Sequence, residues 1–599
     1  MNREPLDRNR STLFAVASWG IGVGLLAVVY GPRLLRSMRR ATHPLIANDD
    51  ARQQIFPFFR YADPALFPKD YLGDYYLEAL LPGGYKLFYR TAALAWDPAV
   101  VASVLPYVLL AVLLVFVAAT AYRLGGTIAS LFAMALCLTG SPYLLSVGGG
   151  LPRAFAFPVL AGGLAALAFG RARLAMVMVW VGAAFYPVAG FLLGVTTTIV
   201  WLALPAGDRG SGRSWSLARR LTMLAITGLV SAALLSPTAI ASGAYGRILS
   251  GADVQQYPET GIGGRYQAKN VPPWPGYFTH AAKVAERSIR GHGRPWLRSG
   301  RRLPPAFWYA LLVVSAVGWI GLLPENPGAR VVTAFAVAAI AGYFVATRVA
   351  PFLYLPPRYV MYPVPLLCVL VIPASFVRLG RWAGAAVGQR LAGPMVAAVS
   401  GIVLLVVMGG EGNPELGLRV DARSSAGLLE AVGRLPKDAM VAGFPRGAVD
   451  DIPLFARRQV LMSSETHQVF HEGYVLEMRR RLRAFLAAYF ATGPEPIRRL
   501  RDEFGVTHLL VDRAHLKGRA PGYFEPFKPW VSKARRDAGG PALLLSRPAT
   551  EAEVYRKGRL RLVDLAVLLG PAGLAPEAAA RSTRDSSNPE ARTAGPALE

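Results

Sequence analysis

The sequence has few charged residues for its length, and few of these are acidic. Charged side chains make up 17% of the 599 residues, with 37 Asp and Glu against 65 Lys and Arg. A soluble domain usually carries nearer a quarter charged residues, so the composition excludes an ordinary soluble protein. Stretches such as VVASVLPYVLLAVLLVFVAATAY carry no charge over more than the ~20 residues that a helix needs to cross a bilayer. The chain is therefore predicted to cross a membrane several times.

Cysteine is also scarce, and several familiar motifs are absent. Cys137 and Cys368 are the two cysteines, and both fall in apolar stretches. Neither is placed for an extracytoplasmic disulfide or a metal site. The sequence has no Walker A motif, no GxSxG and no HExxH, which leaves nucleotide-triphosphate hydrolysis, serine hydrolysis and zinc proteolysis without support.

The chain has an excess of basic residues, with a net charge of +28. In a soluble protein this would suggest nucleic acid. Here the basic residues mostly flank apolar spans, where they set topology and meet anionic lipid head groups. We therefore expect a membrane-lipid partner and no nucleic acid.

The apolar windows predict about eleven membrane-spanning helices, and so a mainly α, polytopic helical bundle. The first span follows Arg3, Arg8 and Arg10 without a small-residue cleavage site, so we expect an uncleaved anchor. The sequence AFYPVAG, between the fifth and sixth spans, is either a tight turn or a proline kink in one long helix. The predicted spans are 12–30, 99–121, 126–146, 154–170, 174–187, 188–204, 221–241, 306–323, 331–347, 360–377 and 392–409.

The charges of the short loops predict a cytoplasmic amino terminus and an extracytoplasmic carboxyl-terminal end. On that topology Arg153, Arg348 and Arg358 lie in short outer loops. The cytoplasmic loops contain more arginine. They hold Arg123, Arg171, Arg173, DRGSGRSWSLARR, Arg330 and RLGRWAGAAVGQR. The basic segment PRLLRSMRR disagrees, but long loops translocate largely regardless of their charge.

The same topology divides the chain into a membrane module and a second domain. Residues 1–409 form the membrane module, with large outer loops at 31–98 and 242–305, the second containing an amphipathic helix in GYFTHAAKVAERSIR. Residues 417–550 are predicted to form a small extracytoplasmic α/β domain. Its expected strands are AMVAGF, QVLMSS, VTHLLVD and PALLLS, and its expected helices are YVLEMRRRLRAFLAAYF and EPIRRLRDEFG. Residues 571–599 have few large apolar residues and are expected to be disordered.

Two adjacent carboxylates, Asp49 and Asp50, lie in the first outer loop in the phrase IANDDARQQIFPFF. Asn48 or Asp49 could cap the helix that follows, because Asn and Asp favour that position. Alternatively, Asp50 or Asp49 could act as a general base, since a carboxylate near lipid and aromatic rings is partly desolvated and takes up protons more readily. Arg52 would oppose that effect. A divalent metal at the acidic pair is a further alternative, although other oxygen ligands are not evident.

Three arginines are candidates for binding a phosphate. Arg153 follows three glycines in GGGLPRAFAFPVL, and glycines allow a backbone to approach a ligand closely. Arg348 and Arg358 flank the aromatic, proline-rich segment before the span at 360–377. Simple contact with lipid head groups is the alternative for each of them.

Other polar clusters have structural interpretations that we favour. Asp450 and Asp451 are expected in a turn or a cap. His467 and His471 have a metal-like spacing without an evident third ligand, and are expected at the surface. Asp70 and Asp74 lie one helical turn apart and are expected on a solvated face, with a substrate cleft as the alternative.

The order of these features resembles the GT-C class of membrane glycosyltransferases, which includes protein mannosyltransferases, aminoarabinose transferases and oligosaccharyltransferase catalytic subunits. The shared features are a first span, an acidic motif in the first large outer loop, many further spans and a soluble carboxyl-terminal domain. The segment DDARQQIFPFFRYADPALFPKDYLGDYY is also similar to uncharacterised bacterial multi-span proteins. The resemblance implies a location in the bacterial inner membrane.

The resemblance further implies roles for the site residues. A first-loop carboxylate, matched here by Asp50 or Asp49, serves as the base or positions the acceptor. Arginines at outer span ends, matched by Arg153 and Arg358, bind the phosphate of a polyprenyl-phosphate sugar. The acidic pair lies farther from the first span than in that class, which puts the identity of the base in doubt. No oligosaccharyltransferase-type carboxyl-terminal signature is present, which argues against asparagine-linked transfer.

The sequence therefore predicts a glycosyltransferase that moves a sugar from a polyprenyl-phosphate donor to an extracytoplasmic glycan, lipid or protein acceptor by inverting displacement, without a required cofactor. The alternatives are a transporter or flippase for a lipid-linked saccharide, a non-catalytic envelope assembly protein, and a polysaccharide polymerase or ligase. The enzyme interpretation requires Asp50, Arg153 and Arg358 to meet on one side of the membrane.

Overall fold

The computed structural model forms two compact units. It describes residues 4–204, 215–261, 263–265, 273–290, 305–350, 355–387, 416–517, 521–538, 543–546 and 548–570. Unit 1 comprises Met1–Ala51, Leu77–Ala244 and Asn270–Asp421. Unit 2 comprises Arg52–Tyr76, Tyr245–Lys269 and Ala422–Glu599. The span expected at 392–409 and the tail expected from 571 lie outside the described residues.

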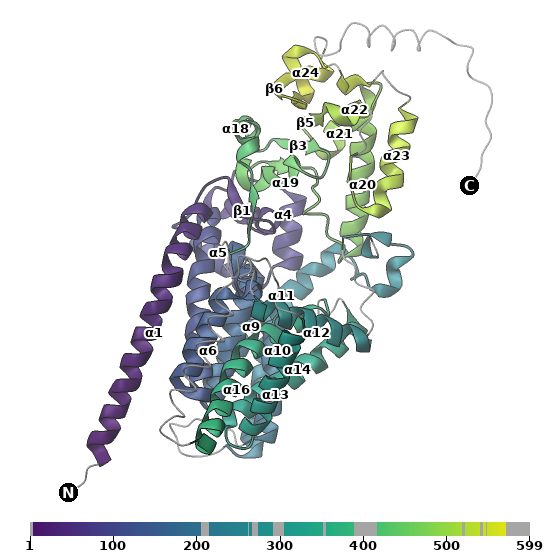
Figure 1. Cartoon of the computed structure of the whole chain (residues 1–599). Helices are drawn as coiled ribbons and strands as arrows, with labels where there is room; N and C mark the ends of the chain where they lie inside the picture. Colours follow the sequence, from purple (N-terminus) through teal and green to yellow (C-terminus); the bar gives the residue numbers. More distant parts are fainter. Residues whose placement is uncertain are drawn as a thin grey trace, which may run out of the picture. The chain divides into compact units, whose positions relative to one another are not determined.

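Unit 1 is a bundle of apolar helices, as the long uncharged stretches predict (Figure 1). Its core is built from aliphatic and aromatic side chains of several helices, for example Leu113, Leu160, Leu192 and Val369. The helices are α1 (Glu4–Ala41), α5 (Gly83–Ala92), α6 (Pro98–Thr139), α7 (Ser141–Ser146), α8 (Ala156–Ala168), α9 (Ala172–Phe185), α10 (Pro187–Ala203), α11 (Leu217–Ser242), α12 (Pro273–Arg290), α13 (Pro305–Leu322), α14 (Pro327–Val349), α15 (Arg358–Met361) and α16 (Pro363–Val387).

Five helices in the described part of the chain are long and apolar enough to cross a membrane by length and composition. They are Ala17–Ala41, Pro98–Thr139, Leu217–Tyr245, Pro327–Val349 and Arg358–Ala385. Shorter apolar helices cover Pro152–Ala168, Ala172–Phe185, Pro187–Ala203 and Tyr309–Leu322. A membrane-embedded, mainly helical chain is thus confirmed, whereas the number of about eleven spans remains a prediction.

The structure shows how two pairs of consecutive predicted spans are connected in unit 1. The expected spans at 99–121 and 126–146 are joined in α6 across a kink at Gly126, whose φ of 78° is not helical. AFYPVAG is a turn between two helices, because α9 ends at Phe185 and α10 begins at Pro187. The two helices approach closely, since a Cβ on Gly182 would lie 2.5 Å from the backbone nitrogen of Gly190.

A short strand pair links the two ends of the membrane module. Strand β1 (Ile46–Asn48) pairs antiparallel with β2 (Leu418–Asp421), with Ile46 opposite Asp421 and Asn48 opposite Leu418. The register shifts between Ala47 and Asn48. The pair holds the start of the acidic motif against the segment that follows the last predicted span.

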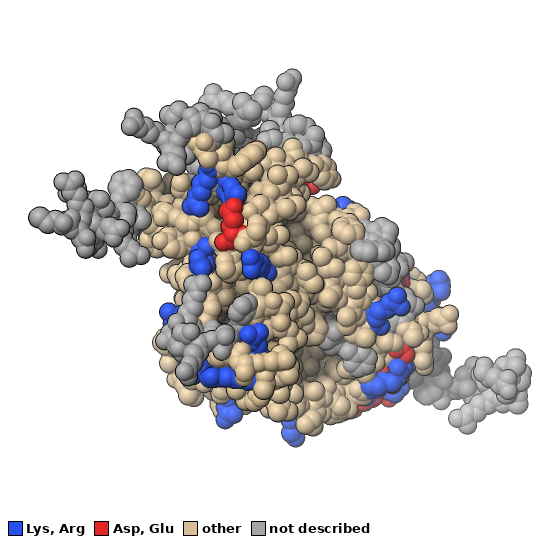
Figure 2. Space-filling view, turned by 90° about the horizontal axis from the view of Figure 1, so that it is seen from below, with Lys and Arg blue, Asp and Glu red and all other residues tan. Residues whose placement is uncertain are grey.

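One end of the unit 1 bundle is basic. At this end Asn326 donates to the carbonyls of Arg123 and Leu124, Arg381 donates to the carbonyl of Gly125, and Arg378 is ion-paired with Glu325. A view from below shows more Lys and Arg than Asp and Glu on this face of the chain (Figure 2). Arg358 precedes α16 and Arg378 lies 20 residues later, so about 30 Å of helix separates them.

Unit 2 contains a five-stranded mixed sheet in the order β4-β3-β5-β7-β6. β3 pairs in parallel with both β4 and β5, while β7 pairs antiparallel with β5 and β6. Every residue of β5 is buried, which explains the apolar run Leu509–Val511 at the centre of its sequence, HLLVD. The strands are β3 (Met440–Gly443), β4 (Gln459–Val460), β5 (His508–Asp512), β6 (Glu553–Lys557) and β7 (Leu560–Asp564).

Unit 2 contains both of the helices that the sequence predicts for the carboxyl-terminal domain. These are α20 (Glu472–Tyr489) and α21 (Glu495–Phe504). The prediction that PALLLS forms a strand is wrong, because Leu544–Ser546 form a 3-10 helix. The strands β6 and β7 complete the sheet instead. The other helices are α2 (Ala51–Gln54, whose first residue belongs to unit 1), α3 (Phe59–Ala62), α4 (Tyr71–Tyr75), α18 (Ala426–Gly433), α19 (Ala448–Asp451), α22 (Arg513–Leu516), α23 (Lys528–Asp537) and α24 (Leu565–Leu569).

Candidate active site

Asp50 and Arg153 meet in unit 1. The Nη1 atom of Arg153 is ion-paired with the Oδ2 atom of Asp50. The side chain of Asp50 is 30% exposed and that of Arg153 is 24% exposed, so the pair is partly open to solvent. A guanidinium group binds carboxylates and phosphates with the same fork of N–H donors. Arg153 can therefore exchange the Asp50 carboxylate for a phosphate.

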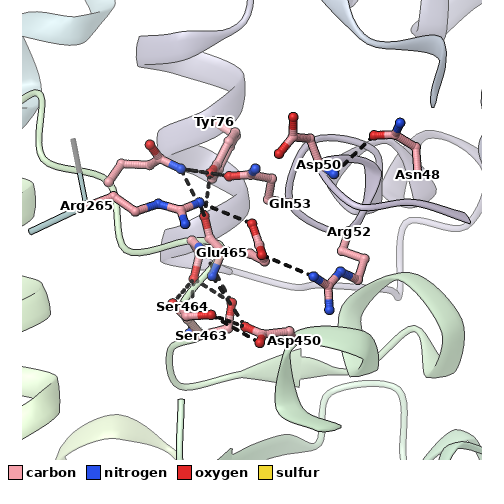
Figure 3. Close-up of polar contacts among 12 residues, drawn as sticks. Asn48, Asp50, Arg52, Gln53, Tyr76, Arg265, Asp450, Ser463, Ser464 and Glu465 are labelled. Carbon is pink, nitrogen blue, oxygen red and sulfur yellow. Dashed lines mark hydrogen bonds and ion pairs between the residues drawn. The ribbon is translucent and has the colours of Figure 1, made fainter. Parts of the chain in front are cut away.

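Asn48 connects this ion pair to the β1–β2 strand pair. Its Oδ1 atom accepts a hydrogen bond from the backbone N–H of Asp50 at 3.1 Å (Figure 3). The same oxygen lies 3.4 Å from Nη2 of Arg153. Its Nδ2 atom donates to the carbonyl of Gly417 at 2.9 Å. The expected capping residue thus also contacts the candidate phosphate ligand.

The glycines before Arg153 allow close approach, as the sequence predicts. Gly149 has a φ of +79°, and a Cβ on it would lie 2.6 Å from the Cβ of Asn48. The next residue, Gly150, accepts hydrogen bonds at its carbonyl from the hydroxyls of Tyr85 and Tyr89, at 3.0 and 2.8 Å. The loop is thus held from both sides, which fixes the start of the 3-10 helix Pro152–Phe155 that carries Arg153.

Arg358 is linked to the start of α8 through aromatic rings. Its Nη1 atom donates to the hydroxyl of Tyr362 at 3.2 Å. The ring of Tyr362 packs edge-on against Phe157, with centroids 5.4 Å apart. Phe157 lies four residues after Arg153, so the segments of the two arginines are neighbours. Arg348, in the last turn of α14, is exposed.

The other charged residues of the acidic motif differ from Asp50. Asp49 is half-buried, and its role remains a prediction. Arg52 is ion-paired within unit 2 with Asp451 at 2.9 Å. It is also ion-paired with Glu465 at 3.1 Å (Figure 3). Burial disfavours the charge of Arg52, but the carboxylates around it outweigh burial and raise its pKa. The charge of Arg52 is therefore already compensated by carboxylates of unit 2.

Asp450 has the capping role that the sequence predicts, whereas the side chain of Asp451 forms an ion pair. Asp450 accepts from the backbone N–H of Gly447 at 2.9 Å, at the start of α19. It also accepts from the hydroxyl of Ser464 at 3.0 Å (Figure 3). Asp451 is the ion-pair partner of Arg52. Both carboxylates stabilise the loops of unit 2.

The expectation that His467 and His471 lie at the surface is wrong, because both are buried in unit 2. The Nδ1 atom of His467 bonds the hydroxyl of Tyr523 at 2.7 Å, and that of His471 bonds the hydroxyl of Tyr75 at 2.9 Å. Burial, together with nearby arginines, lowers the pKa of His467 to about 3. No group of three or more His, Cys, Asp or Glu is placed to hold a metal ion among the described residues.

The expectation that Asp70 and Asp74 lie on a solvated face is also wrong for Asp70, which is buried. Asp70 is buried at the start of α4, where it accepts from the backbone N–H of Gly73 at 2.9 Å. Burial raises the pKa of Asp70 to about 6, although the Gly73 bond and the charges of Arg481 and Arg60 oppose the shift. Asp74 is ion-paired with Arg60 at 2.5 Å. Both act within unit 2.

Sequence reasoning missed the residues that position the site. Tyr85 and Tyr89 are four residues apart on α5 and therefore share one helix face, which is a signal available from the sequence. Asn48 is visible only as a capping candidate. Its contact with Gly417 joins positions 369 residues apart, and no local pattern predicts that contact.

Comparison with known proteins finds similar solved structures. No protein-family model matches the sequence, and no curated protein matches it. ArnT from Cupriavidus metallidurans bound to undecaprenyl phosphate is 14% identical with a TM-score of 0.48, and the similarity covers 91% of this chain and 98% of that chain. The apo structure of the same ArnT is 16% identical with a TM-score of 0.45, covering 91% of this chain and 97% of that chain.

A second similar protein is the oligosaccharyltransferase of Archaeoglobus fulgidus in complex with zinc and sulfate. It is 11% identical with a TM-score of 0.44, and the similarity covers 81% of this chain and 68% of that chain. An oligosaccharyltransferase is one of the kinds of enzyme named in the resemblance to the GT-C class. The roles of individual residues are argued below from the geometry of this chain.

Proposed function

We propose that this chain is a membrane glycosyltransferase that moves a sugar from a polyprenyl-phosphate donor to an extracytoplasmic acceptor with inversion. The observation that carries the proposal is the ion pair of Asp50 and Arg153. It joins a carboxylate and a guanidinium group at a helix end of an apolar bundle. A base and a phosphate ligand are the two groups that this transfer needs.

The reaction proceeds by one displacement. Asp50 takes the proton from an acceptor hydroxyl as the oxygen attacks the anomeric carbon of the donor. The bond between that carbon and the phosphate oxygen breaks, and its electrons stay on the phosphate. Arg153 stabilises the charge that develops there, and the polyprenyl phosphate leaves. The step needs no oxidant or reductant.

Arg358 is the second proposed phosphate ligand. The proposal is supported by its bond to the hydroxyl of Tyr362 and by the packing of that ring on Phe157, four residues after Arg153. Two guanidinium groups would share the charge of the leaving phosphate better than one. Arg348 is exposed, and we assign it a minor role near the lipid head groups.

The reaction would take place at the extracytoplasmic face of a bacterial inner membrane. Arg123, Arg378 and Arg381 lie in or beside short loops at one end of unit 1, and short loops rich in arginine face the cytoplasm. Asp50 and Arg153 belong to the other end, because Arg358 and Arg378 lie at opposite ends of the α16 region. Lipid-linked donors suit that side, where nucleotide sugars are not available.

The test is sugar transfer in membranes that contain the wild type, Asp50→Asn or Asp50→Ala. Radiolabelled polyprenyl-phosphate hexoses and pentoses serve as donors, and released polyprenyl phosphate is measured with the labelled product. Loss of a general base lowers the rate by about 10²–10⁴-fold. The matched control is Asp97→Asn, because Asp97 caps α6 through Ala99 at 2.8 Å and an amide oxygen can do the same. Normal activity of both Asp50 variants at normal expression would contradict the proposal.

A further inference from the structure

Asn48 makes three polar contacts with one amide group. Its Nδ2 donates to the carbonyl of Gly417, so its Oδ1 must face the other way, toward the N–H of Asp50 and Nη2 of Arg153. A carbonyl can only accept a hydrogen bond, which fixes this orientation of the amide. Asn48 is 4% exposed. The amide therefore has one orientation that satisfies its neighbours.

The surrounding backbone is shaped to fit this side chain. A Cβ on Gly149 would lie 2.6 Å from the Cβ of Asn48, and a Cβ on Gly417 would lie 2.6 Å from its Nδ2. Both glycines have positive φ, at 79° and 75°. Three segments of unit 1 thus close around one amide, which holds the backbone at Asp50 in place.

The contact between Asn48 and Arg153 matters when the anion bound to Arg153 changes. In the proposed reaction the donor phosphate takes the place of the Asp50 carboxylate on the guanidinium fork. A carboxylate that gives up its cation becomes a stronger proton acceptor. The backbone bond from Asp50 to Asn48 does not involve the carboxylate, so it can persist while the side chain changes partner.

We propose that Asn48 is a positioning residue that keeps Asp50 fixed while Arg153 passes from the Asp50 carboxylate to the donor phosphate. This inference rests on the proposed function. Asn48 touches neither the reacting atoms nor the sugar, and it acts through Asp50 and Arg153. Donor binding then converts an ion-paired carboxylate into a placed, available base.

The experiment compares Asn48→Ala and Asn48→Asp with the wild type in proteoliposomes, using the same labelled donors. A base displaced by a small distance costs about 10²-fold in kcat, while the donor KM changes little because the phosphate ligands remain. The matched control is Asn326→Ala. Asn326 makes the same kinds of bond at the basic end, to the carbonyls of Arg123 and Leu124 and from the N–H of Gly328, and its loss leaves kcat unchanged.

Two readouts separate positioning from simple stabilisation. In the Asp50→Asn background, Asn48→Ala causes no further loss of residual activity, because the base is already gone. The activity of Asn48→Asp relative to the wild type rises as the pH falls, because its protonated carboxyl can donate to the carbonyl of Gly417. The ratio removes the protonation of Asp50, which both proteins share. If Asn48→Ala does not fold, this pH recovery of the isosteric variant decides the matter.

An unchanged kcat in Asn48→Ala would overturn the inference. So would an equal loss in the presence and absence of Asp50, or an activity of Asn48→Asp relative to the wild type that does not rise at low pH. Wild-type protein that transfers no sugar from any of the donors would instead contradict the proposed function itself.

Discussion

The carboxylate of Asp50 is ion-paired with the guanidinium group of Arg153, although 103 residues separate them in the sequence. The two come from different loops of unit 1, one before α2 and one before α8. Side chains that could bind an acceptor proton and a donor phosphate are thus in direct contact.

Replacement of Arg153 is expected to weaken donor binding and transfer together. Arg153→Lys keeps the charge but loses the two-point fork, and Arg153→Ala loses both, so the loss in kcat/KM should reach about 10²–10³-fold for alanine and be smaller for lysine. Arg358→Ala should act in the same direction. Steady-state kinetics with the labelled donor measures the effect.

The control for Arg153 is Arg330→Ala. Arg330 is an exposed arginine of α14 that donates to the carbonyls of Leu323 and Pro324. It should retain wild-type kinetics. Equal losses in the Arg153 and Arg330 variants would show that general basicity, and not a specific phosphate contact, is responsible.

Arg52 is expected to stabilise unit 2 and not to act in catalysis. Arg52→Met leaves Asp451 and Glu465 without this cation at sites where their side chains are 14% and 12% exposed, so it should cost about 3–5 kcal/mol of unfolding free energy. Arg434→Met should cost about 0–1 kcal/mol, because its pair with Glu430 is mostly exposed. Denaturation of both variants in detergent gives the comparison. Similar costs would contradict the assigned role.

The buried carboxyl of Asp70 should make stability depend on pH. Its pKa is about 6 in the folded chain against an ordinary value of 3.8, so the folded state holds more protons between these values. Its contribution is complete below about pH 4 and is lost as the pH rises through 6, by up to about 3 kcal/mol. Asp70→Asn keeps an acceptor for the N–H of Gly73 and does not titrate, so it should remove this loss.

The measurement for Asp70 is the difference between the two unfolding curves across pH 4–7. His467 works in the opposite direction, because its lowered pKa favours unfolding as the pH falls. It is present in both proteins and cancels in the difference. Parallel curves for the wild type and Asp70→Asn would show that Asp70 does not carry the effect.

Local patterns in the sequence predict most of the elements but not their partners. Long apolar runs predict α6, α14 and α16, and the apolar centre of HLLVD predicts β5. The strands β6 and β7 are missed because EVYRKGRLRLVD is rich in charge and only its RLRL part alternates between polar and apolar residues. PALLLS is apolar but too short to distinguish a strand from a 3-10 turn.

The candidate site is predicted in part, for the same reason. Loop charge predicts that Asp50 and Arg153 lie on one side of the membrane, and the structure shows that they touch. The bond from Asn48 to Gly417 depends on the pairing of β1 with β2, which no local signal encodes. His467 and His471 look polar in the sequence, but tyrosine hydroxyls allow them to be buried.

The most direct test of a glycosyl transfer follows the phosphorus of the donor. Purified protein is reconstituted with a polyprenyl-phosphate hexose and acceptor-containing membranes, and ³¹P NMR distinguishes the donor phosphodiester from a released phosphomonoester. The proposed function predicts that, with the wild type, the monoester appears at the same rate as transferred sugar. With Asp50→Asn, neither the monoester nor transferred sugar is expected to appear. Donor that crosses the bilayer with its phosphodiester intact and yields no glycosylated product would contradict it and identify a transporter.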